Sequence, residues 1–316
     1  MEYLQLIGGL LTLILSGKYL VKASVCLAKR IGISDLIIGM TVVAFGTSAP
    51  ELLVSISAAF KGSPEISLGN VLGSNIANIG LVLATSALIT PIPVQKNTIR
   101  YDWPIMFVSF ILLSLLMFGN NISRFEGFIL FVFLIAYIFW QLTTAKKDSK
   151  TIIFSEKKVQ SKQMPIVVAI VIIVISSFGL AKGADWLVIG ASTLAYKLNI
   201  SERIISITII AIGTSLPELT TSVIAALQKK TDISVGNIIG SNIFNVFSII
   251  GITAIIHPLN FNYIPFLIDI GVMLFIGVLL WIAIYPFKSN YITRSEGFML
   301  LLAYTLYIIF IVFYKV

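Results

Sequence analysis

Two glutamates stand at positions where an ionised carboxylate is costly. Glu51 and Glu218 each lie near the middle of a long apolar stretch, and no lysine or arginine lies close to either of them within that stretch. A carboxylate in the hydrocarbon core of a membrane is unfavourable unless it is paired, hydrated or bound to a cation. Because neither glutamate has a basic partner nearby, the sequence predicts that the two bind a cation.

Hydroxyl and amide side chains surround both glutamates at helical spacing, so each set shares one face of a helix. A proline directly before each glutamate, Pro50 or Pro217, cannot donate to the carbonyl four residues earlier, and we expect a kink that frees backbone oxygens. The next apolar stretch in each half adds amides and a serine four residues apart. The polar positions are Thr47, Ser48, Ser55, Asn70, Ser74 and Asn78 in the first half, and Thr214, Ser215, Ser222, Asn237, Ser241 and Asn245 in the second.

Other polar and small residues have structural interpretations. Asn75 and Asn242 lie off the polar stripe, and we expect them to cap or bridge helices. Asp269 lies a turn or two into an apolar stretch, where we expect it to be solvated at the membrane interface. Small residues four apart let helices approach closely, as expected for Gly69, Gly73, Gly236 and Gly240.

All of these ligands are oxygen atoms, which favour hard cations such as Ca²⁺, Na⁺ or Mg²⁺ over zinc or copper. Mg²⁺ demands strict octahedral geometry, whereas Ca²⁺ accepts a flexible set of oxygens. Two glutamates balance one Ca²⁺ or two Na⁺, so both ions can compete for the same pair. Competition for one site that opens alternately to each side of a membrane is sufficient for antiport.

The composition places the whole chain in lipid. Of its 316 residues, 58% are hydrophobic and only 11% are charged, and the mean hydropathy is +1.00. A soluble chain of this size would lack the polar surface to cover itself. About 20 apolar residues cross a bilayer as a helix. We therefore predict an all-α membrane protein with ten transmembrane helices at 3–29, 34–60, 65–90, 102–119, 125–144, 164–197, 202–227, 233–256, 264–286 and 296–314.

The basic residues indicate the orientation of these spans. Ten spans place both termini on one side, and the loops facing the other side carry 14 lysines and arginines against 5 on the terminal side. Since basic residues gather in cytoplasmic loops, we expect a plasma-membrane protein with both termini extracellular and the basic loop 145–163 cytoplasmic. The net charge of +8 is then an orientation signal and not a sign of nucleic-acid binding.

The chain also contains an internal repeat. Shifted by 167 residues, 34–78 aligns with 201–245 without a gap, and 23 of the 45 positions are identical. The identities include Gly-Thr-Ser-x-Pro-Glu-Leu around each glutamate and Gly-Asn-x-x-Gly-Ser-Asn-Ile-x-Asn in the next stretch. Later, Arg-x-Glu-Gly-Phe from Arg124 recurs from Arg294 with three extra residues. We infer a duplication, with halves 1–144 and 164–316 joined by the linker 145–163.

Each half holds five spans, so the second half must enter the membrane upside down relative to the first. Inverted repeats with a substrate near the midplane are a transporter architecture, because two copies of one unit allow inward- and outward-facing states of similar energy.

The repeated motifs resemble the two alpha repeats of the calcium/cation antiporter superfamily. Over essentially the whole chain, the sequence is most similar to prokaryotic sodium/calcium exchangers of the ten-helix type. The resemblance implies a central core made from the second, third, seventh and eighth spans, with the first and sixth spans sliding past it. It also implies ion ligands at Ala44, Thr47, Ser48, Glu51, Ser74, Asn78, Ala211, Thr214, Ser215, Glu218, Ser241 and Asn245.

The chain departs from some relatives at Asn245, where potassium-dependent exchangers carry an acidic residue. This departure argues against potassium dependence and leaves the site with one negative charge fewer. The proton-coupled branch typically has an acid soon after the Gly-Asn pair, but apolar residues follow Asn70 and Asn237 here.

Enzyme chemistry is poorly supported. His257 is the only histidine, and no phosphate-binding Walker motif occurs. We therefore expect a transporter driven by ion gradients that binds Ca²⁺ and Na⁺ as substrates, with no cofactor and no obligatory protein partner. The alternatives that the residues leave open are a Ca²⁺/H⁺ antiporter and a cation channel lined by the same glutamates.

Overall fold

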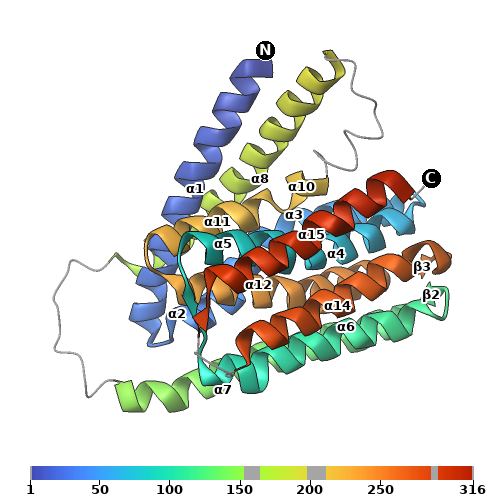
Figure 1. Ribbon diagram of the computed structural model, residues 1–316. Helices are drawn as coiled ribbons and strands as arrows, with labels where there is room; N and C mark the ends of the chain where they lie inside the picture. Colours follow the sequence, from blue (N-terminus) through green and yellow to red (C-terminus); the bar gives the residue numbers. More distant parts are fainter. Residues whose placement is uncertain (1, 153–163, 198–210, 286–290, 315–316) are drawn as a thin grey trace.

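The computed structural model describes residues 2–152, 164–197, 211–285 and 291–314, and almost all of them are helical (Figure 1). The helices are α1 (Glu2–Ile31), α2 (Asp35–Ile38), η1 (Gly39–Val43), α3 (Ala44–Phe60), α4 (Pro64–Ala77), η2 (Asn78–Leu83), α5 (Ala84–Ile89), η3 (Thr98–Asp102), α6 (Trp103–Met117), α7 (Arg124–Ile152), α8 (Ile166–Lys197), α10 (Ala211–Thr214), α11 (Leu216–Leu227), α12 (Thr231–Phe244), η5 (Asn245–Ile250), α13 (Gly251–Ile256), η6 (Ile264–Phe266), α14 (Leu267–Ile284) and α15 (Arg294–Tyr314). Four short strands are β1 (Ile92–Pro93), β2 (Asn121–Ile122), β3 (Leu259–Asn260) and β4 (Tyr291–Ile292).

Within the described ranges, nine helices are long and apolar enough to cross a membrane. They match nine of the ten expected spans to within a few residues, and several are unbroken runs of two or three labelled elements, such as α2, η1 and α3 over Asp35–Phe60. The remaining expected span, 202–227, is described only from residue 211, as α10 and α11. The first part of the expected linker 145–163 continues α7 as far as Ile152, and 153–163 lie outside the described residues.

The most deeply buried long helices carry the repeated motifs. In Pro64–Ile89 and Thr231–Ile256, 72% and 89% of the most apolar stretch is buried inside the protein, against 17% in Arg294–Phe313. A helix with apolar residues all round must lie inside the protein or against lipid. The motif helices therefore form the protein core, while α15 exposes most of its apolar surface.

Two short antiparallel ladders relate the halves of the chain. β1 pairs with β4, with Ile92 opposite Ile292, and β2 pairs with β3, with Asn121 opposite Asn260. Helix α6 connects β1 to β2, while α14 connects β3 to β4. Since each helix starts at the ladder where the other ends, these repeat-equivalent helices run antiparallel. This is the relation expected between equivalent spans of an inverted repeat.

The recurring Arg-x-Glu-Gly-Phe segment has two structural roles. The side chain of Glu126 accepts the backbone N–H of Ser123 at 2.7 Å, and that of Glu296 accepts the N–H of Thr293 at 2.7 Å, so both segments cap their helices. The following glycines permit close helix contacts, because a Cβ on Gly127 would lie 2.8 Å from the carbonyl oxygen of Gly251. A Cβ on Gly297 would meet the carbonyl oxygen of Ala84, the equivalent position, at 3.0 Å. The last span of each half thus packs on the third span of the other.

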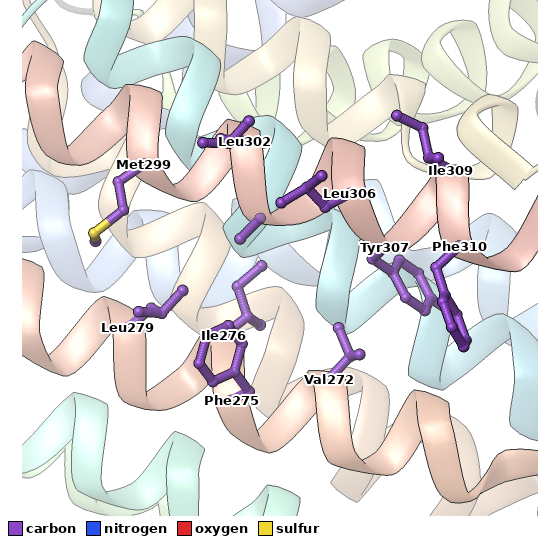
Figure 2. A pocket seen from close by; sticks show the side chains of 11 residues that line it. Val272, Phe275, Ile276, Leu279, Met299, Leu302, Leu306, Tyr307, Ile309 and Phe310 are labelled. Carbon is purple, nitrogen blue, oxygen red and sulfur yellow. The ribbon is translucent and has the colours of Figure 1, made fainter.

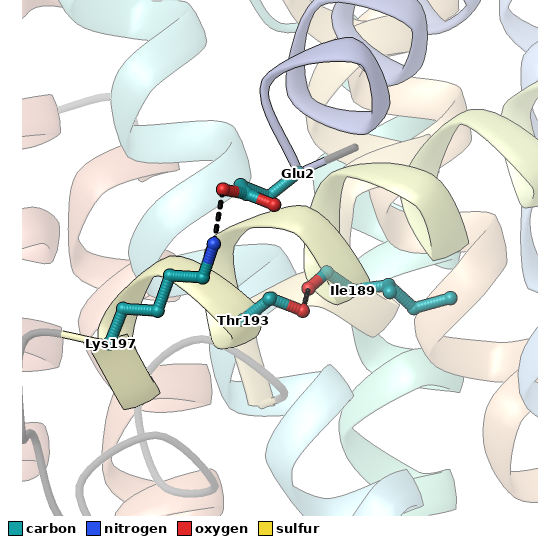
Figure 3. A network of polar contacts seen from close by, with 4 residues as sticks. All are labelled: Glu2, Ile189, Thr193 and Lys197. Atoms are coloured by element: carbon teal, nitrogen blue, oxygen red, sulfur yellow. Dashed lines mark hydrogen bonds and ion pairs between the residues drawn. The ribbon is translucent and has the colours of Figure 1, made fainter.

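Helices α1 and α8 form a closely packed antiparallel pair that stands at an angle to the other long helices (Figure 1). A Cβ on Gly9 would lie 2.8 Å from the carbonyl oxygen of Gly183, and a Cβ on Gly190 would lie 2.9 Å from that of Glu2. The Nζ of Lys197 contacts the Oε1 of Glu2 at 2.5 Å and joins the end of α8 to the start of α1 (Figure 3). The small residues let the two backbones approach.

The pairing of β2 with β3 can be tested with a disulfide that joins the two halves of the chain. In a Cys26→Ser background, Asn121→Cys with Asn260→Cys should form a disulfide on mild oxidation, because opposed residues in an antiparallel pair have Cβ atoms about 4.5–5.5 Å apart. A protease site inserted within 153–163 is then cut, and the two fragments should stay joined on a non-reducing gel.

The matched control combines Asn121→Cys with Tyr291→Cys, whose positions belong to different ladders at opposite ends of α6. This pair should release two fragments. Separation of the fragments in the Asn121→Cys and Asn260→Cys protein would contradict the observed register.

Candidate cation site

The polar motifs lie where regular helices change pitch. The π-helical turn η2 begins at Asn78, η5 begins at Asn245, and η1 directly precedes Ala44 at the start of α3. A π-helical turn widens the backbone locally and is frequent at functional sites. Three of the expected ligands, Ala44, Asn78 and Asn245, therefore lie at junctions between helical segments.

The two prolines have different local effects. Pro50 lies inside α3, which continues without interruption from Ala44 to Phe60. Pro217 lies in the first turn of α11, directly after a break between α10 and α11 at Ser215. The expected disturbance is therefore a helix break at Pro217, whereas at Pro50 the helix continues through the proline.

Side chains from the two motifs meet across the repeat boundary. The Oγ of Ser48 donates to the Oε1 of Glu218 at 3.0 Å. The Oγ1 of Thr47 donates to the Oδ1 of Asn237 at 3.1 Å and lies 3.5 Å from the Oγ of Ser241. Hydroxyls of the first motif thus contact a carboxylate, an amide and a hydroxyl of the second.

A second pair of contacts is the same in both halves. The Nδ2 of Asn70 donates to the Oγ of Ser55 at 3.2 Å, and the Nδ2 of Asn237 donates to the Oγ of Ser222 at 3.0 Å. Each bond joins the glutamate-bearing helix to the next span of the same half. These amides hold the two motif helices together, so Asn70 and Asn237 support the site through their neighbours.

Several buried oxygens around the glutamates have no hydrogen-bond partner within the described part of the chain. Glu51 and Glu218 are 2% and 1% exposed, and an Oε2 atom is unpartnered in each. Buried polar atoms are almost always satisfied, so such a concentration needs an explanation. A bound cation would satisfy oxygen atoms of this kind. The other unpartnered oxygens among the expected ligands are the Oγ atoms of Ser74 and Ser215 and the Oδ1 atoms of Asn78 and Asn245.

The charge around the glutamates is also uncompensated. Ion pairs between described residues join Lys182 to Asp185, Lys197 to Glu2 and Lys230 to Asp35, and none of them involves the two central glutamates. The carboxyl groups of Glu51 and Glu218 also interact electrostatically with one another. Two carboxyl groups buried together without a basic partner favour a cation between them.

The structure places most of the expected ligands in the protein core. Thr47, Ser48, Glu51, Ser74, Asn78, Ser215, Glu218, Ser241 and Asn245 are all buried, as is Ala44. The carbonyl oxygen of Ala44 accepts a hydrogen bond from the Oγ1 of Thr47 at 3.3 Å. Thr214 is half-buried at the end of α10. Ala211 begins α10, and its side chain lies outside the described part of the structure.

The glycines expected to allow close packing do so in the second half. A Cβ on Gly236 would lie 2.4 Å from the carbonyl oxygen of Leu36, and a Cβ on Gly240 would lie 2.5 Å from that of Met40. No described atom lies within 4 Å of a Cβ built on Gly73, and Gly69 approaches only Phe266. Helix α12 therefore packs directly against the backbone of α2 and η1.

Two buried aspartates were not identified as core residues from the sequence. Asp102 is 3% exposed, and its Oδ1 accepts from the Nε2 of Gln141 at 2.9 Å. Asp269, its equivalent after the 167-residue shift, is 7% exposed and accepts from the hydroxyl of Tyr307 at 2.8 Å. The expectation that Asp269 is solvated at the interface is wrong, because its helix turns this side chain towards α15. The shared offset of the two aspartates is the signal that could have indicated a common role.

Two hollows between described helices are lined by none of the expected ligands. One of about 660 Å³ lies between α14 and α15 and is lined by apolar side chains together with Tyr307 (Figure 2). Another of about 400 Å³ lies between the equivalent helices α6 and α7 and reaches Phe247 of η5. Exposed side chains such as Phe275 and Leu306 line the first hollow, as expected for a lipid-facing surface. Neither hollow has the oxygen ligands that a cation requires.

Comparison with known proteins identifies the family of the chain. The family profile described as "Sodium/calcium exchanger protein" matches residues 1–143 and 168–313. Relatives include a putative antiporter, CaxA, of Alkalimonas amylolytica, which is 36% identical over 94% of both chains. Sodium/calcium exchanger MaX1 of Methanosarcina acetivorans is 32% identical over 99% of both chains.

A solved structure of the sodium-calcium exchanger NCX_Mj superimposes with a TM-score of 0.81 at 30% identity, covering 98% of this chain and 97% of that one. The fold, the multi-pass helices and the matched sequence agree. The chain is a multi-pass membrane transporter that belongs to the sodium/calcium exchanger family.

Proposed function

We propose that the protein exchanges Na⁺ for Ca²⁺ at a site between Glu51 and Glu218. The observation that carries this proposal is the contact between the two repeated motifs, in which Ser48 of one donates to Glu218 of the other at 3.0 Å. The unpartnered buried oxygens around this contact are hard ligands of the kind that Ca²⁺ and Na⁺ prefer. The names of the relatives MaX1 and NCX_Mj agree with these two ions.

Charge balance explains how the two ions are coupled. Two carboxylates neutralise either one Ca²⁺ or two Na⁺, so binding of one ion species removes the site for the other. An empty pair of ionised carboxylates in a buried site is unfavourable. The site therefore changes sides most readily when it is occupied, which couples the movement of Na⁺ to that of Ca²⁺.

We also propose the complete ten-span architecture with inverted halves 1–144 and 164–316. The antiparallel course of α6 and α14 supports inversion. The Glu2–Lys197 and Asp35–Lys230 ion pairs lie at opposite ends of the α1–α8 pair, since α1 runs from Glu2 to Ile31. Lys197 lies at one end of the α1–α8 pair and Lys230 lies near the other end. The chain between these two lysines must therefore cross from one side to the other, which supports the tenth span at 202–227.

The proposed orientation has both termini outside and the basic loops in the cytoplasm of a plasma-membrane protein. The tertiary contacts support the sidedness that ten spans require, because the loop contacts named here between described residues join loops expected on the same side. Gln95 donates to Asp232 at 3.0 Å, and both belong to the proposed cytoplasmic face. Asn121 and Asn260 pair in β2 and β3 on the proposed outer face.

The glutamates generate the first functional test. Glu51→Gln and Glu218→Gln each remove one negative charge but keep the side-chain size, and each should reduce calcium flux in reconstituted vesicles by roughly 100-fold or more. The reason is that losing even a group that only supports a metal ligand costs a metal site about 10- to 100-fold in affinity.

Glu65→Gln is the matched control, because Glu65 is exposed in the first turn of α4. Its flux should equal that of the unmodified protein. Near-normal flux in both central variants, with folding verified by thermal unfolding, would refute the site.

The driving ion is tested with defined gradients. An outward Na⁺ gradient should drive ⁴⁵Ca²⁺ uptake into vesicles with equal pH on both sides, because Na⁺ and Ca²⁺ compete for the same carboxylates. Uptake that follows only a pH gradient would instead establish Ca²⁺/H⁺ exchange. Passive conductance that needs no counter-ion would establish a channel.

The orientation is tested by labelling single cysteines in a Cys26→Ser background. Lys96→Cys and Asn260→Cys are both exposed but lie at opposite ends of the helices. A membrane-impermeant maleimide should label Asn260→Cys in right-side-out vesicles and Lys96→Cys only in inside-out vesicles. The reverse pattern would show that the termini are cytoplasmic.

A further inference from the structure

Two buried asparagines outside the expected ligand set contact methionine sulfurs at equivalent positions. The Nδ2 of Asn75 donates to the Sδ of Met273 at 3.9 Å, and the Nδ2 of Asn242 donates to the Sδ of Met106 at 3.7 Å. Both asparagines and both methionines are fully buried. The 167-residue shift relates Asn75 to Asn242 and Met106 to Met273, so the two contacts are repeat-equivalent and each joins one half of the chain to the other.

The methionine determines which way the asparagine amide faces. A thioether sulfur is a weak acceptor and cannot donate a hydrogen bond, so the NH₂ group of Asn75 faces Met273. The Oδ1 of Asn75 then points the other way, where it accepts from the Nδ2 of Asn245 at 3.0 Å. Since the NH₂ group of Asn245 is held by Asn75, its carbonyl oxygen is the end left available.

That carbonyl oxygen is the part of Asn245 that a cation requires. Asn245 is 1% exposed, and its Oδ1 has no hydrogen-bond partner among the residues that the structure describes. Asn245 begins η5, which packs against α3, the helix that carries Glu51. An amide in the opposite orientation would present its NH₂ group and repel a cation.

We propose that Met273 and Asn75 form an orienting relay that sets the Asn245 amide with its oxygen towards the transported cation. Asn75 is thus a positioning residue, and it acts on the ion through Asn245. The proposal rests on the exchange function proposed above, because it requires that a cation is bound near Asn245.

The repeat-equivalent residues form a second set of the same side-chain types. Asn242 is held by Met106, and its Oδ1 is unpartnered within the described ranges. Asn78, the equivalent of Asn245, is 1% exposed, and both of its amide atoms lack a described partner. It begins η2, which packs against α11, the helix that carries Glu218. The relay is therefore formed through Asn75 and Asn245, whereas the amides of the repeat-equivalent pair, Asn242 and Asn78, are not bonded to each other.

A double-mutant cycle between Asn75 and Asn245 tests the relay. The half-saturating Ca²⁺ concentration is measured for Asn75→Leu, Asn245→Ala and the combined variant, by Ca²⁺-dependent thermal stabilisation of the purified full-length protein. Leucine keeps the bulk of the side chain but has no acceptor for the Asn245 amide. Asn75→Leu should raise the half-saturating concentration about tenfold or more, as expected when a group that orients a metal ligand is lost.

The combined variant should be no weaker than the weaker single variant, because Asn75 can act only while Asn245 is present. A change in Asn75→Leu of less than about twofold would overturn the relay, and so would a combined effect equal to the product of the single effects. Unfolding temperatures without Ca²⁺ separate a general loss of stability from a loss of ion affinity. If Asn75→Leu does not fold, Met273→Leu, which removes the sulfur that the Asn75 amide faces, takes its place in the cycle with Asn245→Ala under the same criteria.

The matched control is Ser114→Ala, a buried polar truncation whose Oγ donates to the carbonyl oxygen of Phe110 within α6 at 2.7 Å. It should leave the half-saturating Ca²⁺ concentration unchanged. Sodium-driven calcium flux of the unmodified protein is measured in parallel. Absent flux with coupled Ca²⁺ binding would refute exchange but keep the relay, whereas normal flux without coupling would refute the relay alone.

Discussion

The structure depends on two carboxylates that come from opposite halves of the chain and are buried together. Glu51 and Glu218 are almost fully buried, and no ion pair among the described residues neutralises them. In a membrane interior such a pair is tolerated only with compensating positive charge. The hydroxyls and amides around it are correspondingly rich in oxygen atoms without partners. The uncompensated charges and unpartnered oxygens are costly in the folded protein, and a bound cation would satisfy both.

The surrounding helices hold this pair by contacts that cross between the halves. The β1–β4 and β2–β3 ladders, the packing of Gly127 on Gly251 and the bond from Ser48 to Glu218 all join one half to the other. The carboxylate of Glu218 thus accepts a hydrogen bond from the other half of the chain. A change in the relation between the halves would therefore change the site directly, which is the mechanical requirement of alternating access.

The family profile and relatives that align over nearly the whole chain show that the chain belongs to the sodium/calcium exchanger family. The contacts among its candidate ligands are known only from its own structure. Asn245 illustrates the distinction. The sequence shows an uncharged amide at this position. The bond from Asn245 to Asn75 adds that one end of the amide is already occupied, so only its oxygen remains for an ion. Amide orientation depends on neighbours far away in the chain, and Met273 lies 198 residues from Asn75.

The sequence by itself predicted the spans and the candidate ligands and contained the internal repeat, because apolar length, repeat offset and isolated charge are local or periodic properties. Nine of the predicted spans correspond to described helices, and most of the predicted ligands around Glu51 and Glu218 are buried. Only the tertiary structure decided which groups touch across the halves. The burial of Asp269 against Tyr307 and the bridging role of Asn75 arise from packing between distant helices. Helical periodicity specifies which face a side chain occupies, but only the neighbouring helix decides what that face meets.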